Sequence, residues 1–440
     1  MTTPRIIAAQ VLERIEKDDA YSHLALSAAL DQSSLDSRDK ALVTELVYGT
    51  LTWQRPIDVV LGRFVNRRLD KLDLPLLLAL RLAAYQLIYL DRIPEHAAVN
   101  EAVDYVKDRR GRGAAGFANG ALRAMLRKRD RWDVLHDVDK EDSPVTFLGL
   151  SASLPDWIAR RLLELRGDSA LEEAQAFNRR PPLYYRSLSG VDHLPKSLQP
   201  VEHVPGAYLS HGTDEEIDAA LREKRIVIQD LGSQLIGHYV APPKRGSLLD
   251  ACAGLGGKTL HLASLSPKST ILAVEPQNSK LELLQTTLEV AQISAKINTF
   301  VGTLKKLPSD QGPFDVVLID APCSGLGVIR RHPETRWRRH PRDLRSLVST
   351  QQKLLQEGAK RVAPSGLLVY SVCTFTEEEG PEQIARFLEQ HPDFEREAPP
   401  TKGPVSWKEY LTAEGDLSLF PGLHDTDAFY GARLRRKKAK

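Results

Sequence analysis

The sequence predicts a multidomain protein: an all-α region, then a small α+β region, then a larger α/β region built on a Rossmann-like, doubly wound parallel sheet. Three observations favour this class. The chain has 440 residues, and at roughly 150 residues per domain this length suits two or three domains. Apolar residues recur at helical spacing through the first part of the chain. After residue 229, strand-like runs alternate with helical stretches.

The N-terminal region, residues 1–135, has a helical pattern. The apolar period is clear in PRIIAAQVLERI, in KALVTELVYGTLTW and in DLPLLLALRLAAYQLIYLDRI, and it predicts a bundle of about five to seven helices. Ser22, Asp36 and Asp73 are candidate helix starts. The polar stretch LHDVDKEDSP has no apolar period, so we expect a linker over residues 136–150.

Two further regions follow the linker. Residues 151–228 begin with the amphipathic helix SLPDWIARRLLELRG and continue with short strands and turns. Residues 229–440 predict strands in GSLLDACAG, STILAVEP, INTFVG, FDVVLIDAP and SGLLVYSVC, separated by helices such as NSKLELLQTTLEVAQI. Sheets of this kind bind ligands at the carboxyl ends of their strands, so reactive residues are expected there.

Composition argues against several classes of protein. With 42% hydrophobic and 27% charged residues, the chain has the composition of a globular protein. It contains no run of about 18 uncharged apolar residues, and its first residues lack a signal-peptide pattern, so we expect a cytoplasmic protein without a membrane partner. The three cysteines, Cys252, Cys323 and Cys373, have no CxxC spacing, so we expect neither a disulfide framework nor a metal site.

The net charge is only +2, but residues 107–131, residues 330–345 and the tail RLRRKKAK are strongly basic. Such segregation is typical of a protein that binds a polyanion over a limited face. A solvated surface explains any single basic run equally well. In RRHPETRWRR, the arginines are candidates to hold phosphates, and His332 or Trp337 could stack on a base or pack locally.

The stretch DACAGLGGKT, residues 250–259, ends like a phosphate-binding P-loop. A P-loop requires glycine where this chain has Cys252, and the dinucleotide pattern GxGxxG requires glycine where it has Thr259. Both phosphate-binding hypotheses therefore fail. The remaining interpretation is a strand that delivers Asp250 to a bare backbone turn at a helix N-terminus, whose amides can bind a carboxylate such as that of S-adenosylmethionine. A purely structural turn is the alternative.

Four more residues lie at or near predicted strand ends. Glu275 can accept both ribose hydroxyls of a nucleoside cofactor, or it is a solvated strand end. Cys323 and Cys373 follow two further strands; cysteine is often simply buried, but a thiolate that adds to C6 of a pyrimidine makes C5 a nucleophile for a methyl group. One thiol can then attack while the other helps to resolve the adduct. Asp320, next to Cys323, could hydrogen-bond the cytosine edge and reach the cofactor, or it is a simple turn-forming residue.

The attacking thiol needs a lowered pKa, and Lys258 is a candidate source of positive charge. Taken together, DACAGLGGKT, DAPCSG and the cysteine of YSVCTF resemble the RNA cytosine-C5 methyltransferases. QDLGSQ, IRRHPETRW and DAFYGARL agree with this resemblance, and LRLAAYQLIYLDRIPEHAAVNEAVDYVK resembles the NusB-type RNA-binding domain. Over essentially the whole chain, the combination is similar to the bacterial RsmB (Sun/Fmu) family. The resemblance implies a NusB-like domain over 1–135 and a class I S-adenosylmethionine-dependent methyltransferase domain over 229–440.

The resemblance also implies roles for individual residues. Cys373 would be the nucleophile, Cys323 would assist release of the methylated base, and Asp320 and Lys258 would complete the catalytic group. The implied reaction is methylation of C5 of a cytosine in 16S ribosomal RNA through a covalent Cys373–C6 intermediate, and we expect a monomer. The S-adenosylmethionine site would comprise Cys252, Ala253, Gly254, Leu255, Gly256, Gly257, Lys258, Glu275, Thr303 and Asp320.

The chain departs from the family pattern at four positions. Leu255 replaces a proline, Val372 a threonine and Ala428 a glycine, and Thr303 replaces the aspartate that faces the adenine, which predicts weaker cofactor binding. Three alternatives stay open at this point: a non-catalytic RNA-binding module, an NTPase, and a methyltransferase that acts on transfer RNA. The two cysteines oppose the first alternative and Cys252 opposes the second, but nothing in the sequence excludes the third.

Overall fold

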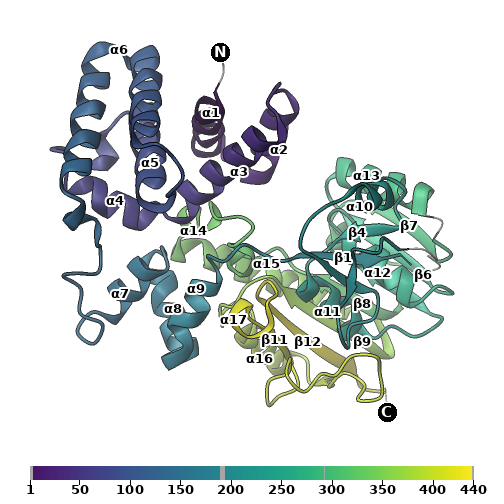
Figure 1. Ribbon diagram of the computed structural model, residues 1–440. Coiled ribbons are helices and arrows are strands. Elements are labelled where there is room, and N and C mark those ends of the chain that lie inside the picture. Colours follow the sequence, from purple (N-terminus) through teal and green to yellow (C-terminus); the bar gives the residue numbers. More distant parts are fainter. Residues whose placement is uncertain (1–2, 189–193, 292, 439–440) are drawn as a thin grey trace. The chain divides into compact units, whose positions relative to one another are not determined.

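The computed structural model describes residues 3–188, 194–291 and 293–438 (Figure 1). These residues form two compact units. The first unit contains the chain up to Arg179 together with the segment Ile329–Arg339, and the second contains Arg180–Val328 and the chain from His340 onward. The described regular structure of the first unit is helical, and the second unit holds two sheets.

Local sequence explains where several helices of the first unit begin. Thr3 caps α1 by accepting a hydrogen bond from the amide of Ile6, and Asp36 caps α3 through the amide of Asp39. α5 is buried over most of its length, which explains its nearly continuous apolar sequence. The helices are α1 (Pro4–Lys17), α2 (Ser22–Asp31), α3 (Ser37–Thr52), α4 (Gln54–Gly62), η1 (Leu69–Lys71), α5 (Leu74–Tyr89), α6 (Glu95–Arg127), η2 (Arg129–Trp132), α7 (Pro144–Ser151), α8 (Asp156–Arg166), η3 (Gly167–Ser169), α9 (Ala170–Ala176) and α14 (Thr335–Arg338). The predicted all-helical N-terminal region is confirmed.

The boundaries between compact units differ from the expected domain boundaries. The expected linker, 136–150, runs into α7, and helices α7 to α9 belong to the first unit together with the N-terminal helices. Arg55 on α4 forms an ion pair of 2.6 Å with Asp156 on α8, which joins these helices to the bundle. The region expected to be one small α+β part, 151–228, is therefore divided at Arg179. Local patterns do not reveal such a grouping, because it depends on contacts between residues far apart in sequence.

The second unit begins with a four-stranded antiparallel sheet of order β2-β3-β1-β4. Tyr185 on β1 and Ile226 on β4 share a small buried cluster with Ile217 on the neighbouring helix α10. This part therefore has an apolar cluster of its own. Its elements are β1 (Leu183–Ser187), β2 (Gln199–Pro200), β3 (Ala207–Ser210), α10 (Glu215–Arg222) and β4 (Ile226–Ile228).

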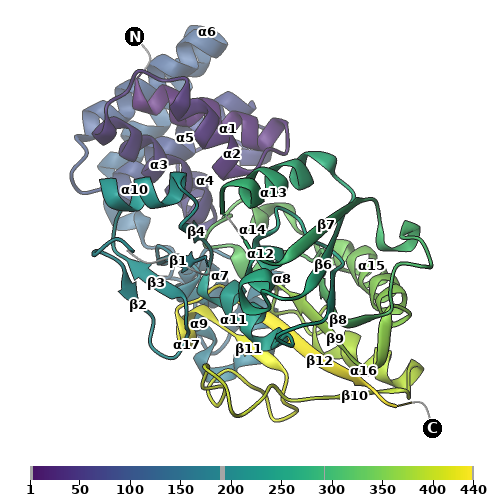
Figure 2. The same cartoon turned by 90° about the vertical axis from the view of Figure 1, so that its right-hand side faces the viewer.

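The larger sheet has the order β10-β12-β9-β8-β5-β6-β7, with β11 paired to β12, and most of these strands lie side by side in Figure 2. Strands β5 to β9 are parallel, and β10 to β12 are antiparallel additions. The strands are β5 (Ser247–Asp250), β6 (Thr270–Glu275), β7 (Lys296–Val301), β8 (Phe314–Asp320), β9 (Val362–Val372), β10 (Phe394–Arg396), β11 (Leu417–Leu419) and β12 (Phe429–Arg436). The predicted parallel, doubly wound sheet is confirmed, and the antiparallel strands extend it.

The direction of strand order reverses beside β5, which has β6 on one side and the later strand β8 on the other. Ligands of doubly wound sheets bind at such a switch point, outside the carboxyl ends of the strands. Consecutive residues of β5, Leu248 and Leu249, enter two different buried clusters, so both faces of the sheet are covered. The helices of this unit are α11 (Leu231–Val240), α12 (Gly257–Leu265), α13 (Asn278–Ala291), η4 (Leu304–Lys306), η5 (Leu326–Val328), α15 (Pro341–Ala359), α16 (Pro381–Gln390) and α17 (Pro421–His424).

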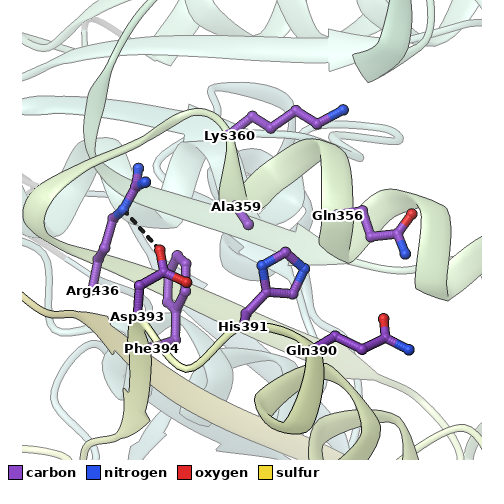
Figure 3. Close-up of a pocket in the computed structure, with 8 residues that line it drawn as sticks. All are labelled: Gln356, Ala359, Lys360, Gln390, His391, Asp393, Phe394 and Arg436. Carbon is purple, nitrogen blue, oxygen red and sulfur yellow. Dashed lines mark ion pairs between the residues drawn. The ribbon is translucent and has the colours of Figure 1, made fainter.

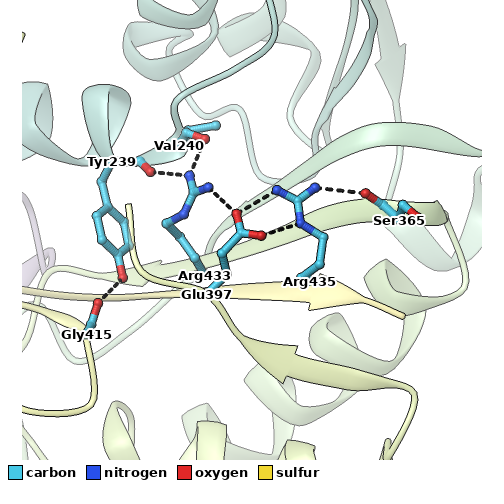
Figure 4. Close-up of polar contacts among 7 residues, drawn as sticks. All are labelled: Tyr239, Val240, Ser365, Glu397, Gly415, Arg433 and Arg435. Atoms are coloured by element: carbon cyan, nitrogen blue, oxygen red, sulfur yellow. Dashed lines mark hydrogen bonds and ion pairs between the residues drawn. The ribbon is translucent and has the colours of Figure 1, made fainter. Parts of the chain in front are cut away.

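A buried polar network fastens β12 to α11 (Figure 4). The guanidinium of Arg433 donates to the carbonyls of Tyr239 and Val240 at 2.7 and 2.6 Å. Glu397 pairs with Arg433 at 2.7 Å and with Arg435 at 2.5 Å. Because the Arg433 side chain is only 2% exposed, its charge depends on this carboxylate for compensation.

A cavity of about 500 Å³ lies near the start of β9, at the opposite end of that strand from Cys373 (Figure 3). An ion pair of 3.3 Å between Arg436 and Asp393 lies at its wall. The lining residues are Gln356, Ala359, Lys360, Gln390, His391, Asp393, Phe394 and Arg436. None of the residues predicted for the functional site is among them.

Candidate active site

The glycine turn joins the end of β5 to the start of α12. Gly254 (φ +55°) and Gly256 (φ +84°) have left-handed conformations that favour glycine. A Cβ at Gly256 would lie 2.4 Å from Leu284, whereas a Cβ at Gly254 would meet no atom within 4 Å. The turn therefore presents bare backbone to open space at Gly254, and the first amides of α12 follow directly.

Two side chains from the start of the turn are removed from solvent to different degrees. Asp250 is fully buried and accepts a hydrogen bond of 2.7 Å from the hydroxyl of Thr259, while its other oxygen has no partner among the described residues. Burial raises the pKa of Asp250 to about 6. Cys252 is half-buried, and burial together with the nearby carboxylates raises the pKa of its thiol. Cys252 is therefore a neutral thiol that packs beside the turn.

Glu275, at the end of β6, braces the turn. One carboxylate oxygen accepts the amide of Gly254 at 3.1 Å, and the other accepts the amide of Gln277 at 3.1 Å. Each oxygen keeps a further lone pair with which it can accept a hydrogen bond from a ligand. Thr303 is exposed just after β7. Because β5, β6 and β7 are neighbouring parallel strands, the glycine turn, Glu275 and Thr303 lie side by side at the carboxyl ends of these strands.

Asp320, at the end of β8, is held through both carboxylate oxygens. Lys258 forms an ion pair with one oxygen at 2.6 Å, and the hydroxyl of Ser371 donates to the other at 2.8 Å. Burial opposes the charge on Lys258, but the carboxylate of Asp320 outweighs burial, so the pKa of Lys258 is raised. Cys373 contributes to the same rise in pKa, which places its thiol within electrostatic reach of the ammonium group.

The two remaining cysteines meet at this end of the sheet. The Sγ atoms of Cys323 and Cys373 are 3.3 Å apart, although the residues follow different strands. Both side chains are half-buried, and neither is in a disulfide. The hydrogen bond with Cys373, burial, and the charges of Cys373 and Glu379 raise the pKa of Cys323. Cys323 is therefore held as a neutral thiol.

Gly327 joins the two cysteine loops to the chain just before β12. Its amide donates to the carbonyl of Cys373 at 3.0 Å, and its own carbonyl accepts the amide of Ala428 at 3.0 Å. A Cβ at this position would lie 2.0 Å from the oxygen of Ala428 and 2.8 Å from that of Cys373. Only glycine permits this approach of three backbone segments.

The segment Ile329–Arg339, which follows the Cys323 loop, corrects one of our hypotheses for a single arginine, Arg336. Arginines here were candidates to hold RNA phosphates, but Arg336 is fully buried in the first unit. Its guanidinium donates to the carbonyl of Ser153 at 3.2 Å and to the side chain of Asn178 at 2.7 Å. Burial lowers the pKa of Arg336 to about 9. This arginine is therefore a structural group that binds main-chain carbonyls and cannot reach RNA.

The aromatic residues of this segment also pack locally, the alternative to base stacking. The indole of Trp337 donates to the carbonyl of Leu51 at 2.6 Å. The ring of His332 lies 4.9 Å from that of His23, measured between centroids. The buried carboxylate of Glu334 accepts the amide of Ser22 at 2.9 Å. The segment is therefore an integral part of the helical unit.

Three residues that organise the site were missed from the sequence: Gly327, Ser371 and Glu379. Gly327 and Ser371 each lie within a few residues of a cysteine, and this proximity was the available signal. Glu379 stands in the acidic run EEEG, where only the structure distinguishes it from its neighbours. All three act through contacts between segments that are distant in sequence.

A doubly wound sheet with its switch point beside a glycine turn is the arrangement of class I methyltransferase domains, and here it follows an all-helical region. Within the described residues, no group of three or more His, Cys, Asp or Glu side chains is placed to hold a metal ion. In the same residues, no helix has the length and apolarity to cross a membrane.

Comparisons with known proteins agree with this class. The family model "16S rRNA methyltransferase RsmB/F" matches residues 238–435, and the NusB family model matches residues 2–127. The probable ribosomal RNA small subunit methyltransferase B of Bacillus subtilis (strain 168) is 31% identical over 451 residues, covering 99% of each chain. The protein of the same name from Synechocystis sp. is 31% identical over 453 residues, covering 99% of this chain and 100% of its own.

The fold is also shared with solved structures. A methyltransferase homologue from Pyrococcus horikoshii has 22% identity and a TM-score of 0.57, covering 67% of this chain and 99% of that chain. The present chain belongs to the RsmB/F methyltransferase family, as its full-length similarity to the curated relatives shows. The resemblance derived from the motifs is thereby confirmed.

Proposed function

We propose that this protein transfers a methyl group from S-adenosylmethionine to C5 of a cytosine in small-subunit ribosomal RNA, with Cys373 as the nucleophile. The observation that carries the proposal is the pair of thiols, 3.3 Å apart, beside the ion pair of Lys258 and Asp320. A single buried cysteine usually has a packing role. Two half-buried thiols in contact at the ligand-binding end of a parallel sheet suit covalent chemistry on a pyrimidine.

The residues at the ends of β5, β6 and β7 fit the methyl donor. The open space at Gly254 and the first amides of α12 suit the methionine carboxylate. Glu275 keeps acceptor capacity for the ribose hydroxyls, and Thr303 offers a neutral hydroxyl where a carboxylate is usual in the family. When bound, S-adenosylmethionine supplies an electrophilic methyl group. The roles of the remaining residues follow from what the target ring requires.

Cys373 must be a thiolate to add to C6 of the cytosine. The positive charge of Lys258 lies within electrostatic reach of Cys373, and a nearby cation favours the charged form of a thiol. When the Cys373 Sγ–C6 bond forms, the electrons of the C5–C6 double bond become available at C5, which can then accept the methyl group. Asp320 is held by two partners and is 30% exposed, so its carboxylate can accept a hydrogen bond from the cytosine edge.

Release requires loss of the C5 proton and of the Cys373 thiolate. The hydrogen bond with Cys373 and the charge of Cys373 help to raise the pKa of Cys323, and both disappear once Cys373 is bonded to C6. Cys323 can then give its own proton to water and accept the proton from C5. The C5–C6 double bond reforms as the electrons of the Sγ–C6 bond return to Cys373.

The substrate class rests on the relatives and on a basic surface. Both relatives described above carry small-subunit ribosomal RNA in their names. On α6 the side chains of Lys107, Arg109, Arg110 and Arg112 are exposed, and such cations suit RNA phosphates. The target cytosine must be unstacked, because the thiolate has to approach C6 from the face of the ring.

Bisulfite sequencing of total RNA from cells with and without the gene tests this function. We expect at least one protected cytosine of 16S ribosomal RNA to lose protection, with rescue by the wild-type gene and none by Cys373→Ala. If a transfer RNA lost a mark while ribosomal RNA stayed unchanged, the ribosomal assignment would be wrong. If no RNA lost a C5 mark, the proposed reaction itself would be refuted.

A further inference from the structure

Glu379 is a completely buried acid that lies between the two cysteine loops. It follows β9 by a few residues, just before α16 begins at Pro381. Being buried, its carboxylate is not exposed to substrate, so it acts only through neighbouring residues. Its hydrogen-bond donors are neutral groups, and no cationic side chain among the described residues forms an ion pair with it.

The contacts of this carboxylate reach both sides of Cys323. One oxygen accepts the amide of Ser324 at 2.8 Å and the side-chain amide of Gln351 at 3.0 Å. The same Gln351 amide donates to the carbonyl of Pro322 at 3.0 Å. Residues before and after Cys323 are therefore tied, directly or through one side chain, to Glu379.

The other carboxylate oxygen holds the Cys373 loop. It accepts the hydroxyl of Thr376 at 2.8 Å. The hydroxyls of Ser324 and Thr374 are 2.9 Å apart and add a direct link between the loops. The main-chain carbonyl of Glu379 accepts the hydroxyl of Tyr370, on β9, at 2.7 Å. One side chain thus sets how the two thiol-bearing loops meet.

We propose that Glu379 is a positioning residue that fixes the Cys323 loop against the Cys373 loop and whose charge makes the Cys323 thiolate a stronger base. The charge part is supported by electrostatics, because Glu379 is one of the groups that raise the pKa of Cys323. A stronger base accepts the C5 proton more readily. The role of Glu379 in release of the methylated cytosine rests on the proposed function, whereas its effect on the Cys323 thiol does not.

A labelling experiment without RNA tests the charge. In a Cys373→Ser background, iodoacetamide modification of Cys323 at pH 8 is followed by peptide mass spectrometry. Glu379→Gln keeps the shape and an acceptor for Ser324 and removes the charge; Glu377→Gln, an exposed acid on the same loop, is the matched control. We expect labelling at least about threefold faster for Glu379→Gln, because loss of the nearby negative charge lowers the pKa of Cys323 and so increases its thiolate fraction. Equal rates in all three proteins would overturn the proposal.

A second pair of measurements separates charge from position. Glu379→Asp keeps the charge and shortens the side chain, so Cys323 should label at the wild-type rate while turnover falls. Labelling as fast as in Glu379→Gln would refute the charge role. With Cys373 intact and RNA present, Glu379→Gln should increase the fraction of protein trapped as a covalent RNA adduct, because a weaker base removes the C5 proton slowly. An unchanged fraction refutes the role in release. If even Cys323→Ala forms no adduct, the proposed function fails while the labelling result stands.

Discussion

Replacing Gly327 by alanine is expected to disable the site although no reactive side chain is removed. The new Cβ would lie 2.0 Å from the carbonyl oxygen of Ala428 and 2.8 Å from that of Cys373, whereas ordinary contact begins at 3.4 Å. The backbone segments must therefore separate by about 1 Å, and a displacement of this size is enough to move a reacting group out of its productive position. The hydrogen bonds that Gly327 makes with Cys373 and Ala428 would be stretched or broken.

A misplacement of about 1 Å costs about 100-fold in rate, which corresponds to about 2.7 kcal/mol in the barrier. We expect single-turnover methylation of ribosomal RNA by Gly327→Ala to slow by about this factor. The affinity for S-adenosylmethionine should stay within about twofold of wild type, because the residues proposed to bind it at the ends of β5, β6 and β7 do not contact Gly327. Gly403→Ala is a matched control, since its Cβ would meet only the carbonyl of Pro400, at 3.6 Å. A wild-type rate in a Gly327→Ala protein that unfolds in urea like wild type would refute the argument.

Three further predictions concern other parts of the second unit. Cys373→Ala should abolish turnover, and Cys323→Ala should accumulate a covalent RNA adduct on denaturing gels; full methylation by Cys373→Ala would contradict the mechanism. Burial raises the pKa of Asp250 from 3.8 to about 6. The protonated side chain therefore stabilises the folded state fully at pH values below 3.8, the pKa in the unfolded chain, and this stabilisation is lost as the pH rises through 6. Urea unfolding between pH 4 and 7 should therefore show wild type losing up to about 3 kcal/mol more stability than Asp250→Asn. Glu397→Ala leaves Arg433 buried without the carboxylate that pairs with it. Because Glu397 is 32% exposed, the free energy of unfolding should fall by about 2 to 3 kcal/mol, less than for a fully buried pair. Glu395→Ala, an exposed neighbour, should unfold in urea like wild type.

The parts predicted from sequence are those determined by local pattern. Strands β5, β6, β8 and β9 contain continuous apolar runs because both faces of the sheet are covered there. The glycine turn was recognisable because Gly254 and Gly256 are needed for its backbone. Cys323 and Cys373 were expected at strand ends, and the structure brings their sulfur atoms together.

The parts not predicted depend on contacts between distant segments. Arg336 was expected at the surface because arginine is almost never fully buried unless its donors are satisfied. Its partners are carbonyls and an amide that lie some 160 to 180 positions earlier in the chain, and no local pattern reveals them. The same holds for helices α7 to α9, whose grouping with the N-terminal helices depends on residues such as Arg55.

The place of Arg336 has a consequence for how the protein can be divided. A fragment that ends at Arg179 would contain every N-terminal helix yet lack Ile329–Arg339, which completes that unit. The carbonyl of Ser153 would lose its donor, and the amide of Ser22 would lose the carboxylate of Glu334. The helical and catalytic parts are therefore not interchangeable modules, because a gene that recombined at this point would leave part of one unit's interior encoded with the other.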